Sequence, residues 1–177
     1  MNEVVDTETP SSKEHLNYVF GISDRQDDYY LAKLASEAHI LGIIHTTRAV
    51  FDVFAFLVNG VLLNGAIPKN KCDIRAVVKV LQPSPLKSEL KTLIESYWFK
   101  YISAFINISK HRMLVKHSFH VGFQDSYTGI RVGAFDYNNQ QYPRYKANEL
   151  LKGVVEVKNK IVDCGQYLNN QVISRDA

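Results

Sequence analysis

The residue types best suited to chemistry gather in one short segment, residues 107 to 120. Half of the six histidines fall there, beside Lys110, Arg112 and Lys116, and the segment contains no carboxylate to neutralise them. Arginine can hold a phosphate with two parallel hydrogen bonds, and histidine can give or take a proton near neutral pH. The segment therefore predicts a site for an anion, with Lys110 and Lys116 as phosphate-binding residues.

A second group of polar side chains interrupts the most apolar stretch of the chain. His45, Asp52 and Asn59 are spaced by seven residues, so they share one face of a helix. Arg48 lies four residues before Asp52, a spacing at which an ion pair forms easily. Each buried polar group without a partner costs about 1–3 kcal/mol. We therefore expect Asp52 and Asn59 to face the basic segment and to orient Arg112 or a histidine.

The spacing of Arg112 and His117 resembles the Arg-x4-His motif of HEPN domains, small helical bundles found in many prokaryotic defence and toxin systems. The string Asn-x-x-Lys-His-Arg that ends at Arg112 is similar to that of bacterial HEPN-like proteins, as is the apolar helix with its polar face. The resemblance implies metal-independent RNA cleavage by a homodimer. It also implies that Arg112 holds the scissile phosphate, and that His117 moves the proton of the 2′-hydroxyl or of the leaving oxygen.

Four further residues are expected to support this site: Asp52, Asn59, Asn107 and His111. No metal is expected, because the three histidines of the segment follow no metal-binding spacing. No cofactor is expected either, since the chain carries no phosphate-binding glycine loop and no hydrolase motif. RNA and a second copy of the chain are the expected partners.

The same residues allow a plainer interpretation. Arg48 and Asp52 can form a structural pair, and the basic side chains can form a solvated face. The alternative function is a non-catalytic helical interaction or assembly module, either antitoxin-like or a subunit of a larger complex. It rests on two features. The last predicted helix has an apolar seam with the spacing of helix packing, and the predicted hairpin needs a surface to pack against because two strands alone are marginally stable. A small-molecule pocket beside Asp52 and Asn59 is a third interpretation.

Hydrophobic spacing predicts the helix that carries the polar face. It is expected to begin at Asp27 or Asp28 and to end at Asn64-Gly65, with a kink or a split near Gly42. Beyond residue 49 the sequence is apolar nearly all round, which predicts a central, buried helix.

The remaining elements follow in order along the chain. A short helix is expected over residues 73–81, and one amphipathic helix from Ser84 to beyond Phe105. Alternating apolar residues predict a β-hairpin near residues 118–136, followed by a polar loop from Tyr137 to Pro143. The last helix begins near Tyr145, and its apolar seam is Leu150, Val154, Val157, Ile161, Cys164 and Leu168.

The composition fits a globular protein: 177 residues, 46% hydrophobic, with a formal charge of +3. We expect a mainly α fold, a helical bundle of four to five helices with an inserted β-hairpin. A single domain over residues 27–177 should follow a partly flexible segment over residues 1–26. The two cysteines form no CxxC motif, so two buried thiols are expected, with a disulfide as the alternative.

A cytoplasmic protein without a membrane segment is expected. Glu3 and Asp6 precede any apolar run, which is unlike a secretory signal. The charge-free stretch Val53 to Leu63 is shorter than the ~20 residues that span a bilayer.

Overall fold

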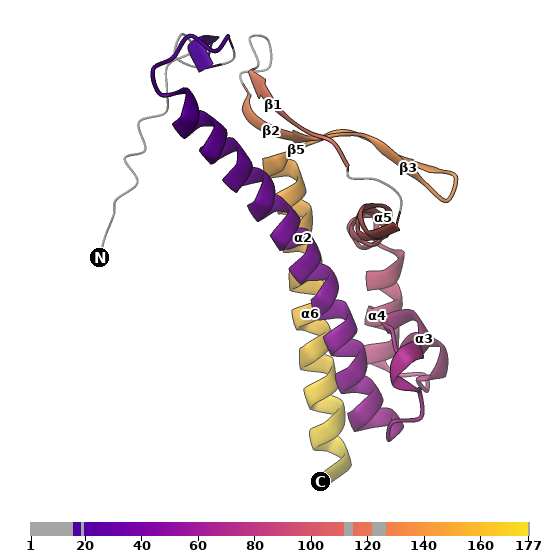
Figure 1. Ribbon diagram of the computed structural model, residues 1–177. Helices are drawn as coiled ribbons and strands as arrows, with labels where there is room; N and C mark the ends of the chain where they lie inside the picture. The colour runs from indigo at the N-terminus through magenta and orange to yellow at the C-terminus, as the bar shows by residue number, and fades with distance from the viewer. Residues whose placement is uncertain (1–15, 19, 112–114, 122–126, 177) are drawn as a thin grey trace, which may run out of the picture.

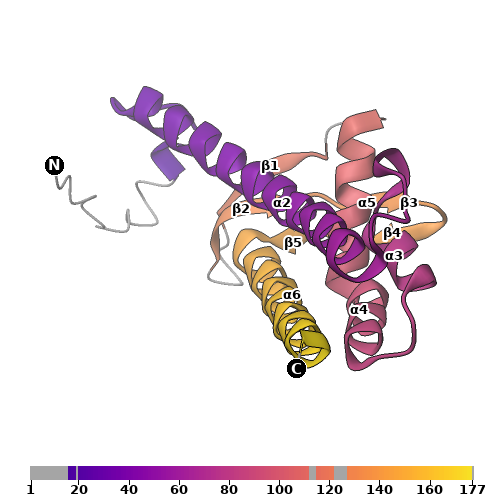
Figure 2. The same cartoon turned by 90° about the horizontal axis from the view of Figure 1, so that it is seen from below.

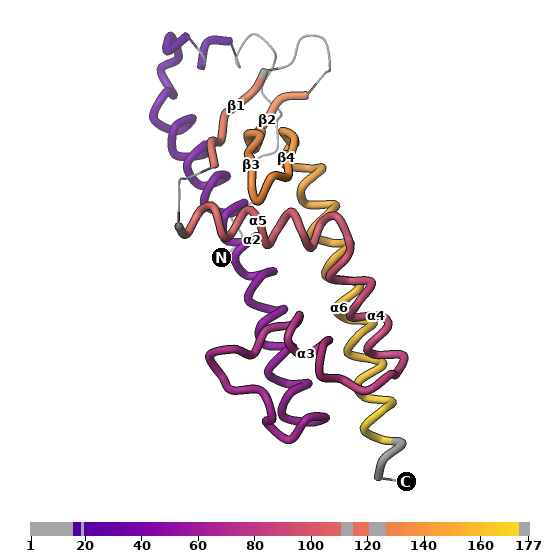
Figure 3. Tube along the Cα trace, turned by 90° about the vertical axis from the view of Figure 1, so that its right-hand side faces the viewer, coloured from indigo at the N-terminus to yellow at the C-terminus, as the bar shows by residue number. Residues whose placement is uncertain are grey.

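Two long helices span most of the length of the molecule. The computed structural model describes residues 16–18, 20–111, 115–121 and 127–176. Helices α2 (Gln26–Leu63) and α6 (Ala147–Asp176) run side by side in the same direction (Figures 1 and 3). The mainly α fold with an inserted β-hairpin, which the sequence predicted, is confirmed. The expected flexible segment falls largely on residues 1–15, which lie outside the described residues.

Helix α2 is one continuous helix of 38 residues, so the kink or split expected near Gly42 does not occur. Its N-cap is Arg25 instead of Asp27 or Asp28, and the Arg25 side chain pairs with Asp28 at 3.0 Å. The helix ends where predicted, because Asn64 and Gly65 adopt left-handed conformations with φ of 51° and 74°.

The chain then turns back through the short elements η1 (Lys69–Lys71), α3 (Ile74–Val80) and α4 (Pro85–Glu95). The Asp73 carboxylate accepts a hydrogen bond from the Ala76 N–H at 2.7 Å, and the Ser84 hydroxyl accepts one from the Lys87 N–H at 3.2 Å. These caps satisfy amide groups that a helix start leaves unpaired, which is why both helices begin where the sequence predicted.

The single helix predicted from Ser84 to beyond Phe105 is wrong. The chain breaks at Ser96, which is extended with ψ of 149°, and α5 (Tyr97–His111) begins directly after it. The Ser96 hydroxyl donates to the Leu93 carbonyl at 2.7 Å, and such local bonds compete with helix continuation. The break lets α5 cross α2, so that its end reaches the polar face of that helix (Figure 3).

The predicted hairpin forms from β1 (His117–Val121) and β2 (Thr128–Val132), with Phe119 opposite Ile130. Strand β5 (Tyr145–Lys146) extends it to three strands in the order β1-β2-β5. The sheet does not stand alone. Ile130 and Val132 are buried, and the Phe119 ring packs edge-on against Tyr29 of α2 at 5.2 Å.

The loop predicted from Tyr137 to Pro143 is instead part of a second hairpin, β3 (Phe135–Tyr137) and β4 (Gln140–Tyr142). Asn138 and Asn139 both adopt positive φ, 50° and 60°, which is the geometry of a tight two-residue hairpin turn. The strands are hard to recognise in the sequence because their polar residues, Asp136, Gln140 and Gln141, are exposed to solvent.

The core is one cluster to which every long helix contributes. All six seam residues of α6 are buried, so that prediction is confirmed, and the seam is used inside the molecule instead of for assembly. Cys72 and Cys164 are free and buried, as expected. Helix α2 differs from its prediction: it is not buried on all sides, because α3, α5 and α6 pack against its inner side only.

Candidate functional site

Polar side chains of α2 and α5 meet in a surface pocket of about 390 Å³. Helix α2 contributes His45, Arg48 and Asp52, and the end of α5 contributes Lys110. Arg48 Nη1 donates a hydrogen bond to Asp52 Oδ1, in an ion pair whose side chains are 26% and 42% exposed. The structure thus brings Asp52 close to the basic segment, although its hydrogen bond goes to its neighbour on the same helix. Two cations against one carboxylate leave the pocket with a positive excess.

Asn59 does not face the basic segment. Its side chain is buried and bonds both ways to the backbone of Ile67: Nδ2 donates to the carbonyl at 2.9 Å, and Oδ1 accepts from the N–H at 3.1 Å. The expectation that Asn59 supports the anion site is therefore wrong. The amide holds the turn after α2 in place, which satisfies two backbone groups that would otherwise be buried without partners.

Asn107 begins the basic segment, and Lys116 lies further along it, just before β1. Asn107 is half-buried on α5, and its Nδ2 donates to the Tyr137 hydroxyl at 3.1 Å. This bond ties α5 to the second hairpin. Lys116 is exposed just before β1, and its backbone carbonyl accepts from the Gly133 N–H at 2.7 Å. The Lys116 side chain is therefore placed on the surface, where it can meet an anion.

His117 is the first residue of β1 and is half-buried, with its ring facing the Phe105 ring at 6.3 Å. Burial lowers the pKa of His117, while the Glu37 carboxylate and a hydrogen bond with the Val115 backbone act in the opposite direction. The Nε2 atom is buried and has no hydrogen-bond partner in the part of the chain that the structure describes. The imidazole is therefore neutral near pH 7, with one nitrogen unused.

Of the predicted catalytic pair, the structure describes only His117. Arg112 lies outside the described residues, as does the side chain of His111. The pairing of Arg112 with His117 therefore stays a prediction. His117 itself is the first residue of β1 and is not among the described residues that line the pocket of Lys110.

The described residues contain neither a metal-binding cluster nor a thiol that is ionised at neutral pH. No three of their His, Cys, Asp or Glu side chains come together as a metal site would require. Burial raises the pKa of the Cys164 thiol to about 12, so it carries almost no thiolate at neutral pH.

A second surface lies on the exposed side of α2, next to the basic pocket, whose lining includes Thr46 and Ala49. Six residues follow a four-three spacing on its exposed side: Gly42, Thr46, Ala49, Val53, Phe56 and Gly60. We call them the outward seam. None is charged. Arg48 and Asp52, the two charged residues between positions 38 and 63, both lie at the pocket. Seen from below, α5 and α6 flank α2, and no described helix covers its outer side (Figure 2).

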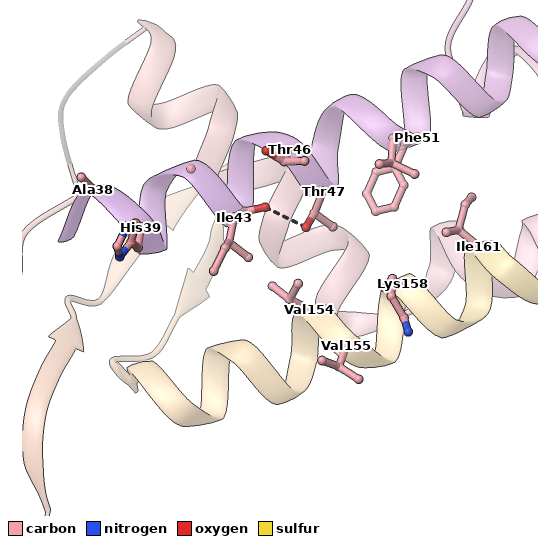
Figure 4. A pocket seen from close by; sticks show the side chains of 12 residues that line it. Ala38, His39, Ile43, Thr46, Thr47, Phe51, Val154, Val155, Lys158 and Ile161 are labelled. Atoms are coloured by element: carbon pink, nitrogen blue, oxygen red, sulfur yellow. Dashed lines mark hydrogen bonds between the residues drawn. The ribbon is translucent and has the colours of Figure 1, made fainter. Parts of the chain in front are cut away.

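More apolar side chains border the outward seam. On α2 the partly exposed residues are Ile43, Val50, Leu57 and Val61, and on α6 Val155 is exposed beside them. Between the two helices runs an apolar groove of about 500 Å³, in which Ile43 and Val154 point toward each other (Figure 4). Only Lys158 brings a formal charge to its rim.

No protein-family model, curated protein or solved structure matches this chain. The resemblance to HEPN domains therefore rests on the residues of the sequence alone. The two surfaces described above, the basic pocket and the outward seam, are what the fold itself offers.

Sequence reasoning missed the outward seam because it assigned every apolar residue of α2 to the core. The signal was present as a run without charges that is apolar nearly all round, and part of it repeats every three and four residues. Among the described helices, α2 alone is long and apolar enough to span a bilayer by length and composition. The best window has a mean hydropathy of 1.6, but only 22% of it is buried.

Proposed function

We propose that this chain is a non-catalytic helical assembly module, and that it forms a homo-oligomer through the exposed side of α2. One observation carries the proposal: the uncharged outward seam and the apolar side chains on its α6 side form one exposed surface, with Arg48 and Asp52 confined to its other edge. The largest apolar patch on a typical monomer covers about 300–600 Å² and often marks an interaction site. Val53 at the centre of this surface is 66% exposed, and Leu57 beside it is 49% exposed.

The mass of the purified protein in solution tests the proposal. Light scattering across a range of concentrations should give a multiple of 20.2 kDa for the natural chain. The variant Val53→Glu should return a single-chain mass, because a carboxylate in an apolar contact loses its hydration. The matched control is Thr92→Glu, which adds the same charge at an exposed position on α4 and should leave the mass unchanged. A single-chain mass for the natural protein at every concentration would refute the proposal.

A second candidate function is RNA binding, with cleavage at Arg112 and His117 as the HEPN resemblance implies. Two observations favour it. Lys110 and Arg48 leave a positive excess in one pocket, and His117 keeps a buried nitrogen without a partner among the described residues. A neutral imidazole is the form that can accept a proton from a 2′-hydroxyl.

Binding and cleavage of RNA are separable measurements. Fluorescence anisotropy with a labelled single-stranded RNA should show binding that weakens several-fold in Lys110→Ala. The control Lys100→Ala removes an exposed lysine of the same helix that does not line the pocket, and it should bind like the natural protein. Cleavage in EDTA should disappear in both Arg112→Ala and His117→Ala. Binding that is insensitive to Lys110, or cleavage that survives both substitutions, would remove this candidate.

A further inference from the structure

We propose that the partner on the outward seam is a second copy of this chain, with its α2 lying antiparallel and the two-fold axis passing between the two helices at the level of residue 51. This inference rests on the proposed homo-oligomer and adds its geometry. The axis pairs Gly42 with Gly60, Thr46 with Phe56, and Ala49 with Val53.

The spacing of the outward seam identifies a helix as the occupant. A four-three repeat keeps a stripe of side chains facing a neighbouring helix along its length, which the 3.6-residue turn alone does not. The seam of α6 shows the same spacing and is filled by other helices of this molecule. The outward seam has the same spacing, but no described helix covers it.

The small residues of the seam permit a close approach. A Cβ atom added at Gly42 or at Gly60 would meet no described atom within 4 Å, so both positions open directly to the outside. Ala49 and Thr46 lie between them on the same stripe. Small side chains at such positions let two helix backbones come together, and the contact then buries the larger neighbours.

The order of sizes along the seam favours the antiparallel orientation. In a parallel pair each residue would face its own copy, so that Phe56 would oppose Phe56 and Val53 would oppose Val53. In the antiparallel pair Phe56 opposes Thr46 and Val53 opposes Ala49, so each large side chain meets a small one. The second arrangement never places two large side chains opposite each other, so the two helices can approach closely.

The groove beside α2 can accept the Leu57 side chain of the second copy. Leu57 lies on the border of the seam toward α6, and in the antiparallel register it faces residues one turn from Gly42. There the groove is lined by Ile43, Thr46 and Val50 (Figure 4). Leu57 of the second copy would thus cover the apolar floor of the groove.

The size of the surface matches this occupant. The exposed apolar side chains of the seam and its borders present on the order of 600 Å², near the roughly 800 Å² that each partner buries in a standard interface. A bilayer fits less well. Spanning one would bring Arg48 and Asp52 near the middle of the hydrocarbon, where each charge costs at least about 2.5 kcal/mol, and would pull the fully buried Phe51 out of the core.

Disulfide trapping tests the orientation, with variants that each add one exposed cysteine to the buried Cys72 and Cys164. We expect a mixture of Thr46→Cys and Phe56→Cys, oxidised after subunit exchange, to give one disulfide-linked dimer that joins position 46 to position 56. Neither variant alone should cross-link, because its two copies would lie about 15 Å apart along the helix at 1.5 Å per residue. A mixture of Ser36→Cys with Phe56→Cys is the control and should not cross-link, since Ser36 is exposed on α2 away from the seam.

Two results would overturn the inference while leaving the homo-oligomer intact: a disulfide formed by Phe56→Cys alone, which signals parallel helices, or a dimeric mass without any link between positions 46 and 56. A single-chain mass would remove the inference together with the proposed function. Vesicles of phosphatidylcholine serve as the last arm, and binding of the single chain to them would assign the seam to a lipid surface instead.

Discussion

The two long helices carry the same kind of seam and use it in opposite ways. In α6 the four-three stripe consists of large residues from Leu150 to Leu168, and all of it is buried inside the molecule. In α2 the stripe from Gly42 to Gly60 consists mostly of small residues and lies on the outside. The comparison teaches that the four-three spacing identifies a surface that can pack against another helix. Side-chain size and position then decide whether that helix belongs to the same chain or to a second copy.

The largest effect is expected on the α6 side of the comparison. Leu150→Ala should lower the free energy of unfolding by about 2–5 kcal/mol, because it leaves a cavity under a fully buried residue. Urea unfolding followed by circular dichroism measures the change. A loss below about 1 kcal/mol would mean that the seam of α6 does not hold the core together as the structure indicates.

The next effect concerns the buried polar group on the inner side of α2. Asn59→Ala removes both hydrogen bonds to Ile67 and should cost about 1–3 kcal/mol of unfolding free energy. The same urea experiment measures it. Asn159→Ala on the exposed side of α6 is the control and should shift stability by less than about 0.5 kcal/mol. Equal effects of the two substitutions would contradict a structural role for Asn59.

A smaller effect is expected when the substitution made at Leu150 is repeated on the outer side of α2. Leu57→Ala should leave the unfolding free energy of the single chain within about 1 kcal/mol, because the side chain is half exposed. It should raise the dissociation constant of the dimer about tenfold, which corresponds to about 1.4 kcal/mol. Sedimentation equilibrium gives that constant. An unchanged dissociation constant would show that Leu57 lies outside the interface.

The smallest effect is the pH dependence that His117 contributes. Its pKa is lowered by burial in the folded chain, so below the unfolded value of about 6.5 the unfolded chain binds more protons than the folded one. The contribution of His117 to stability is therefore complete above about pH 7.5 and is lost as the pH falls through 6.5 toward the folded pKa. Urea midpoints at pH 5.5 and 7.5 should differ less in His117→Phe than in the natural chain. An identical difference in both proteins would show that the burial of His117 has no such consequence.

Much of the fold could be predicted because local signals agree with the final structure. Asn64-Gly65, the Asp73 cap and the Ser84 cap all act through bonds to nearby backbone, which sequence spacing reveals. The break at Ser96 was missed, because an apolar stripe continues across it and the decision depends on how α5 packs over α2. The second hairpin was missed because each of its strands has only three residues, too few to show an alternating pattern.

The candidate site was predicted less well for a physical reason. Spacing by seven placed Asp52 and Asn59 on one face of α2, but two residues on one face can still have different neighbours along 38 residues of helix. Asp52 lies where α5 crosses, whereas Asn59 lies beside the turn that carries Ile67. Likewise, the apolar character of α2 could not reveal which of its sides the other helices would leave uncovered.

The central claim is that another chain covers Val53, and the labelling rate of a cysteine at that position tests it most directly. In Val53→Cys the reaction with a maleimide should slow as the protein concentration rises, while Ser36→Cys on the same helix should react at one rate throughout. Cys72 and Cys164 are buried and contribute little to the signal. A cysteine at position 53 that reacts as fast as the control at every concentration would contradict the claim.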